Sequence, residues 1–173
     1  MENQVSSKSI ILNQGLYLGI VSILINVVVY AMGNHLQPHW SVSVISIIVM
    51  TAFIVMGMKQ FKTGNGGFMS WSQAVKIGVG LTMISAVIVT IYNQIFMNFI
   101  EPDLMQQMAA VQEQAWIDAG LSSDQIDASK EMMEKFQSPL ITSAIGLVAS
   151  AFFGFIVSAI AGAIMKESAE EQY

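Results

Sequence analysis

Four long apolar blocks dominate the pattern of hydrophobic and polar positions along the chain. A membrane-spanning helix needs roughly 20 apolar residues, with a range of about 17 to 25. None of the four blocks contains a charged residue; they are Leu16–Met32, Val42–Met58, Ile77–Ile100 and Leu140–Met165. The first two are short, but each can extend into uncharged neighbours. The pattern therefore predicts four transmembrane helices, at about residues 12–33, 41–60, 71–100 and 139–166.

The predicted fold class is all-α, an integral membrane four-helix bundle that forms a single domain over residues 1–173. A soluble four-helix bundle is the alternative, and it would need a polar face on every helix. The last apolar block offers only Ser, Thr and Gly for such a face. Charged residues make up 11% of the chain, whereas a typical soluble domain has about a quarter. The membrane interpretation therefore fits the chain better.

The positions of the lysines predict the orientation of the chain, because short cytoplasmic loops are enriched in basic residues. Five of the seven lysines flank the start of the first span, the second connection and the end of the last span: Lys8, Lys59, Lys62, Lys76 and Lys166. We therefore expect both termini to lie in the cytoplasm. A cleaved signal peptide is the competing interpretation of the first span, because "VYA" at 29–31 resembles a cleavage site, but the apolar run continues past it.

Acidic residues are concentrated between the last two spans, where residues 101–138 hold eight of the twelve. Pro102 and Gly120 are typical of a helix start and a helix end. Ser122 and Gln125 have the spacing of a capping box, which predicts a second helix that ends before Pro139. We expect an external amphipathic helical hairpin here; a disordered acidic loop is the alternative.

Small residues recur every four positions along the last span. Because hydrophobic burial does not drive helix pairing in lipid, such a ridge favours close helix packing. Its members are Thr142, Gly146, Ser150, Gly154, Ser158 and Gly162, and Gly15 and Gly19 form a shorter pair in the first span. The ridge could pack only within the chain, or it could form a face for a second copy or a partner, or a sliding surface that changes conformation, and the sequence leaves these open.

The composition excludes several kinds of chemistry. There is no cysteine and no arginine, so thiolate sites and guanidinium clamps for phosphate are absent, and we expect no nucleic-acid partner. His35 and His39 have a spacing that suits a metal on a helix, but Pro38 lies between them. We read them as a solvated pair, and we expect no metal, no cofactor and no catalytic residue.

Uncharged polar residues near one end of the spans are the remaining candidates for a site. Asn26 and Tyr30 lie in the first span, and Asn93 and Gln94 in the third. They could hydrogen-bond across helices and fix the packing, or they could form a polar ligand site near the outer surface. Both interpretations expect the two pairs to meet.

The connection "KQFKTGNGGFMSWSQAVKIGVG" first suggests a phosphate loop, but no strand precedes it. Gly64, Gly66 and Gly67 suit a tight cytoplasmic turn, Ser70 suits a helix cap, and Trp71 suits the membrane interface. The stretch resembles the signature of the domain of unknown function 4199 family, four-helix membrane proteins from Bacteroidota. "IYNQIFMNFIEPDL", the acidic segment and "SP" before a glycine-rich last span follow in the same order. The resemblance implies a fold and an inner-membrane location, and no activity.

The sequence favours an interaction or accessory protein that acts through its external hairpin and the small-residue ridge. Beyond the lipid bilayer, the expected partner is another protein or a second copy. The alternative is a small transport or permeation component with a polar site near Asn26 and Asn93. We do not expect an enzyme, because no nucleophile motif and no buried charge accompany these residues.

Overall fold

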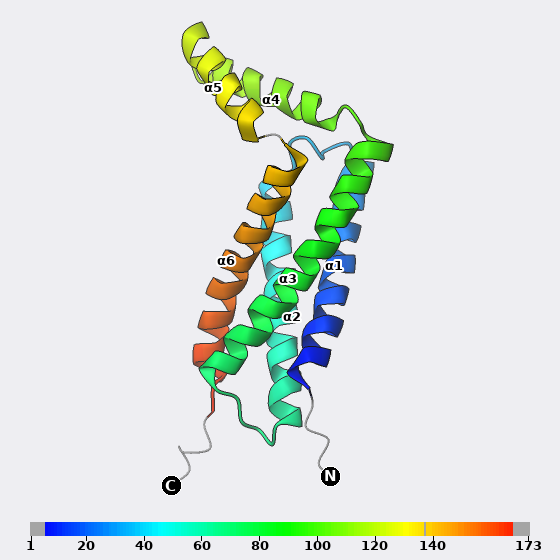
Figure 1. The fold of residues 1–173 in the computed structure, drawn as a ribbon, viewed down its shortest axis with the longest axis vertical. Coiled ribbons are helices and arrows are strands. Elements are labelled where there is room, and N and C mark those ends of the chain that lie inside the picture. The colour runs from blue at the N-terminus through cyan, green and yellow to red at the C-terminus, as the bar shows by residue number, and fades with distance from the viewer. Residues whose placement is uncertain (1–5, 137, 168–173) are drawn as a thin grey trace.

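A computed structural model describes residues 6–136 and 138–167. Residue 137 of the expected hairpin and the two ends of the expected domain lie outside the described residues. Over the described part of the chain, six α-helices and one π-helix form, with no extended strand (Figure 1). They are α1 (Ser7–Ala31), α2 (Trp40–Gly64), α3 (Trp71–Ile95), the π-helix η1 (Phe96–Ile100), α4 (Leu104–Asp118), α5 (Ser123–Phe136) and α6 (Pro139–Met165).

Four of these elements are long and apolar enough to cross a membrane: α1, α2, α3 continued by η1, and α6. α1 begins at Ser7 and α2 continues to Gly64, so both helices extend beyond the uncharged core of their spans. Lysine and glutamine are good helix formers, and a lysine side chain can extend along a helix end toward the headgroups. The polar flanks therefore continue the helices that the apolar blocks begin.

α3 is the central helix of the four, and its most extensive contacts are with α1 and α6. Small residues allow these close approaches. A Cβ atom added to Gly15 would lie 2.7 Å from Cβ of Ile84, and one added to Gly80 would lie 2.9 Å from Cδ1 of Ile11. α1 therefore packs its glycines onto side chains of α3, and α3 does the same toward α1.

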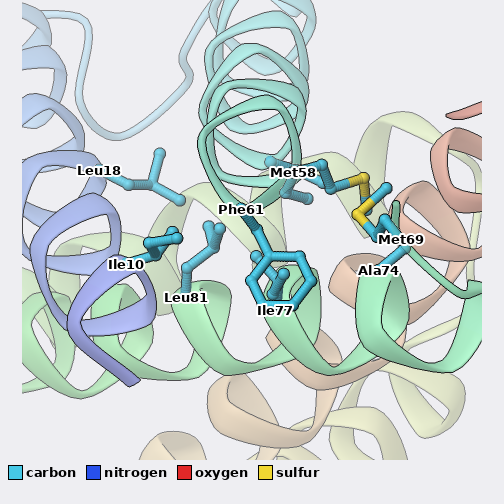
Figure 2. Packing of buried hydrophobic residues seen from close by; sticks show 9 residues of the cluster. Ile10, Leu18, Met58, Phe61, Met69, Ala74, Ile77 and Leu81 are labelled. Atoms are coloured by element: carbon cyan, nitrogen blue, oxygen red, sulfur yellow. The ribbon is translucent and has the colours of Figure 1, made fainter. Parts of the chain in front are cut away.

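The hydrophobic core lies at one end of the four long helices, where α1 begins and α6 ends (Figure 1). We call this the lower end, and we call the end that carries α4 and α5 the upper end. The core side chains come from the lower halves of α1, α2 and α3 and from the connection between α2 and α3. They are Ile10, Leu18, Ile54, Met58, Phe61, Met69, Ala74, Ile77 and Leu81 (Figure 2). Tight packing is therefore concentrated at the lower end.

The connection between α2 and α3 is held by the chain that follows α6. Gly66 and Gly67 adopt positive φ angles of 66° and 92°, whereas Gly64 is still the last residue of α2. Met69 exchanges two backbone hydrogen bonds with Glu167, of 3.0 and 2.9 Å. The Lys62 ammonium lies 2.6 Å from the Glu167 carboxylate. The turn thus anchors the end of the last span as well as reversing the chain.

Both predicted capping boxes form. Ser70 accepts from the Gln73 backbone N–H, and the Gln73 side chain accepts from the Ser70 N–H at 2.8 Å, which starts α3. The Ser122 N–H donates to the Gln125 side chain at 2.9 Å, just before α5. The Trp71 indole N–H donates to the carbonyl oxygen of Ala159 at 3.1 Å, so this aromatic residue also joins α3 to α6.

α4 and α5 lie beside each other at the upper end (Figure 1). Gly120, with φ of 79°, turns the chain between them, and the Lys130 ammonium lies 2.6 Å from the Glu113 carboxylate. In α4, Leu104 is buried while Met108 and Ile117 are exposed. Since nine helical residues turn through about half a circle beyond two full turns, the two exposed side chains point in different directions. α4 therefore exposes large apolar side chains on more than one side.

Candidate functional site: a hollow between the four long helices

The lower half of the small-residue ridge of α6 is occupied within the chain. Gly154, Ser158 and Gly162 are buried. A Cβ atom added to Gly162 would lie 2.7 Å from Cβ of Ala74, and one added to Gly154 would collide with the Thr82 hydroxyl. On α3, Ala74 and Thr82 belong to a matching row of small residues that also includes Gly78. This half of the ridge is therefore an α3–α6 contact and offers no surface to a second chain.

The upper half of the same ridge is not packed in this way. A Cβ atom added to Gly146 would meet no other atom within 4 Å. Gly146 and Ser150 instead line a hollow of about 620 Å³ between α1, α2, α3 and α6. This volume falls within the range of small-molecule sites, about 300 to 1,000 Å³. The ridge thus changes its role halfway along α6.

The lining of the hollow is uncharged and comes from all four long helices. Its polar members are Ser22, Ser43, Ser46, Thr82, Ser85, Thr90, Asn93 and Ser150, and its other members are Leu18, Val42, Ile47, Met50, Ala86, Val89, Gly146, Ala149 and Phe153. They reach from the middle of the spans to the upper end. The core residue Leu18 lies at the inner limit, so the hollow ends where the tightly packed core begins.

α3 contributes side chains that are available for binding. Thr82 donates its hydroxyl to the carbonyl oxygen of Gly78 at 3.0 Å, the usual way for a membrane helix to satisfy a hydroxyl. By contrast, Ser85 and Asn93 form no side-chain hydrogen bond within residues 6–136 and 138–167. Ser85 is only 6% exposed. Both polar groups still reach accessible surface, so a polar occupant of the hollow can form hydrogen bonds with them.

A smaller cavity of about 100 Å³ adjoins the hollow toward the upper end and shares Thr90, Asn93 and Gly146 with it. Gln94 also lines this cavity and donates to the Ser143 hydroxyl at 3.2 Å. Met105 of α4 closes part of its wall. Asn93 therefore lines two adjacent spaces, and α4 reaches the upper one.

The structure does not bring the four predicted polar residues together. Asn93 and Gln94 line the cavities, but Asn26 donates to the carbonyl oxygen of Ser22 at 2.9 Å, in its own helix. Its amide lies along α1 and does not reach α3, because a nearby backbone carbonyl already satisfies it. Tyr30 instead packs edge-on against Phe96, with ring centroids 4.9 Å apart. The polar site is thus on α3, without the two residues of α1.

The two histidines have separate environments, which corrects the expectation of a solvated pair. Nε2 of His35 lies 3.0 Å from the Glu101 carboxylate, and both side chains are largely buried. His39 accepts through Nδ1 from the Ser41 backbone N–H at 3.3 Å and so caps α2. Among the described residues, no group of three or more His, Cys, Asp or Glu side chains could hold a metal ion.

Comparison with known proteins places the chain in a family. The family model described as "Protein of unknown function (DUF4199)" matches residues 13–167, nearly the whole chain. The chain belongs to this family. No curated protein and no solved structure matches it. Family membership thus accounts for the resemblance of the turn and the last two spans, and the function of this family member must be argued from its own geometry.

Sequence reasoning missed most of the lining of the hollow, above all Ser85 and Thr90. A signal was available: Thr82, Ser85, Thr90 and Asn93 fall within one side of α3 at 3.6 residues per turn. Hydroxyls on a membrane helix usually bond to their own backbone, so this row of polar residues did not by itself indicate a binding site. Only the separation of the helices at the upper end reveals which of these hydroxyls face an open space.

Proposed function

We propose that this family member is a non-enzymatic inner-membrane protein that binds, and gives passage to, an uncharged polar molecule in the hollow. The observation that carries the proposal is a charge-free space of about 620 Å³ into which the accessible polar groups of Ser85 and Asn93 open. Proton relays and ion-coupled pumps use charged groups at depth. A lining of hydroxyls and one amide instead suits a neutral molecule.

The packing supports access from one side only in the described conformation. The lower end is filled by the core, including Ile54, Ile77 and Leu81, which are fully buried. The upper end holds the wide part of the hollow. The lysine distribution supports a cytoplasmic lower end. In this proposal the molecule enters from the outside, and passage to the cytoplasm requires the core at the lower end to open.

Thiol labelling tests the proposed access, because the chain has no cysteine of its own. Val89→Cys places a thiol in the lining of the hollow, and Ile77→Cys places one in the closed core. With the protein in liposomes, we expect a small water-soluble thiol reagent to label the Val89→Cys variant from the α4–α5 side and to leave the Ile77→Cys variant unlabelled. Equal labelling of the two, or no labelling at position 89, would contradict the proposal.

A matched pair of substitutions tests passage. Asn93→Leu removes the amide that lies between the two cavities, whereas Asn26→Leu removes an amide that bonds only to its own helix. We expect the rate of uptake of a small uncharged polar solute into liposomes to fall with Asn93→Leu and to stay near the wild-type rate with Asn26→Leu. If both variants lower uptake to the same extent, the polar site does not lie on α3.

An interaction role is the second candidate, and α5 favours it. Met132 and Phe136 lie four residues apart on one side of α5 and are 63% and 55% exposed. Large apolar side chains exposed together are typical of contact surfaces. Deletion of residues 103–137 should release a bound partner while the spans still assemble. Retention of a stoichiometric partner by the deletion variant would remove this candidate.

A further inference from the structure

We infer that the occupant of the hollow is a small uncharged polyol, a molecule with hydroxyl groups along one edge and C–H groups along the other. This inference rests on the proposed function, because it names the class of molecule that the same hollow takes. Three features of the lining carry it: the absence of charge, the spacing of polar groups on α3, and the apolar side chains that α2 and α6 add to the facing wall.

The absence of charge selects against ions. None of the residues that line the hollow is Asp, Glu, Lys, Arg or His. An ion that enters a membrane interior loses its hydration, and only charged or densely polar groups compensate for that loss. The nearest pair of ionisable side chains in the upper part, His35 and Glu101, contact each other and do not line the hollow. The occupant is therefore neutral.

The polar groups on α3 form a row that matches a molecule with several hydroxyls. Ser85, Thr90 and Asn93 line the hollow at successive depths, and the rise of an α-helix places neighbouring members about 4.5 to 7.5 Å apart along its axis. A hydroxyl or amide side chain both donates and accepts hydrogen bonds. A polyol hydroxyl does the same, so it can satisfy whichever group is free at each level. A molecule with one polar group would leave the others unpaired.

Part of the facing wall suits the C–H edge of such a molecule, although Ser43 of α2 and Ser150 of α6 also line the hollow. Ile47 and Met50 of α2 and Phe153 of α6 line the hollow with apolar surface. Ser46, on the same part of α2, donates its hydroxyl to the carbonyl oxygen of Val42 at 2.8 Å and is already satisfied. A polyol that bonds to α3 would therefore place its carbon skeleton against these apolar side chains. A fully apolar occupant would leave the polar side chains of α3 without hydrogen-bond partners.

Protection of an introduced thiol tests the inference on the full-length protein in liposomes. The Val89→Cys variant is labelled with a small neutral thiol reagent in the presence of xylitol, pentanediol or xylonate. These probes share a five-carbon chain but differ in the number of hydroxyls or in charge. We expect xylitol to slow labelling in a saturable manner, and we expect pentanediol and xylonate at equal concentration to leave the rate unchanged.

Variants combined with Val89→Cys identify the contacts. We expect Asn93→Leu to raise the half-protecting concentration of xylitol about fivefold, the effect of losing one net hydrogen bond, while Asn26→Leu leaves it unchanged. No protection by xylitol, or equal protection by pentanediol, overturns the polyol inference. In that case, labelling of position 89 without a competitor still supports the proposed hollow. If position 89 is not labelled even without a competitor, the proposed function fails as well.

Discussion

Two glycines of the same helix give the sharpest test of how α6 packs. Gly154 and Gly146 belong to one row of small residues, and the sequence does not distinguish them. In the structure, any side chain at position 154 collides with the hydroxyl of Thr82. Thr82 is itself buried and donates to the carbonyl oxygen of Gly78 at 3.0 Å, so it cannot move aside without losing that bond. At position 146 there is open space.

The expected magnitude follows from this difference. Substitution of either glycine by leucine raises helix propensity by a similar amount, up to about 1 kcal/mol, and this gain cancels when the two variants are compared. Overpacking of a closely packed contact costs about 1 to 3 kcal/mol, occasionally more. We therefore expect Gly154→Leu to be less stable than Gly146→Leu by at least about 1 to 3 kcal/mol.

Reversible unfolding of the two variants in mixed micelles, with tryptophan fluorescence as the signal, measures the difference. Gly154→Ala serves as a milder variant, since the added Cβ atom alone already meets Thr82. Equal destabilisation by leucine at positions 146 and 154 would refute the reasoning, because it would mean that α6 contacts a neighbour along its whole length.

Three further predictions concern the ends of the helices. Gly67 has φ of 92°, so Gly67→Ala should lower the unfolding free energy by about 1 to 2 kcal/mol, and Ser70→Ala should lower it by about 1 kcal/mol through loss of the α3 cap; unchanged unfolding curves would contradict both. His35→Ala and Glu101→Gln should each destabilise the upper end, and a double-mutant cycle should give a coupling free energy of about 1 kcal/mol. A coupling free energy of zero would show that the 3.0 Å contact between the two side chains contributes nothing.

The features that the sequence predicted well are local ones. An apolar block and its flanks determine a span, and the spacing of Ser70 and Gln73 determines a cap, because both depend on contacts within a few residues. The pairing of His35 with Glu101 could not be predicted in this way. The two residues are 66 positions apart, and they meet only because α1 and α3 lie side by side along their length.

The hollow depends on a property that no local pattern encodes. Gly146 and Gly154 have the same residue type and belong to the same four-residue repeat, although the eight residues between them rotate the direction by about 80° about the helix axis. The positions of the neighbouring helices decide that one is open and the other buried. Likewise, Ser85 and Thr82 are both hydroxyl residues on one side of α3, yet only Thr82 bonds to its own backbone. The candidate site therefore required the positions of the helices relative to one another.

The hollow itself is tested most directly by filling it. Gly146→Leu adds a side chain where no other atom lies within 4 Å, at a position that lines both cavities. Combined with Val89→Cys, it should sharply slow labelling of the introduced thiol from the α4–α5 side, while the unfolding free energy stays near that of the parent protein. An unchanged labelling rate in the leucine variant would contradict the account, because position 89 would then be reached by a route other than the hollow.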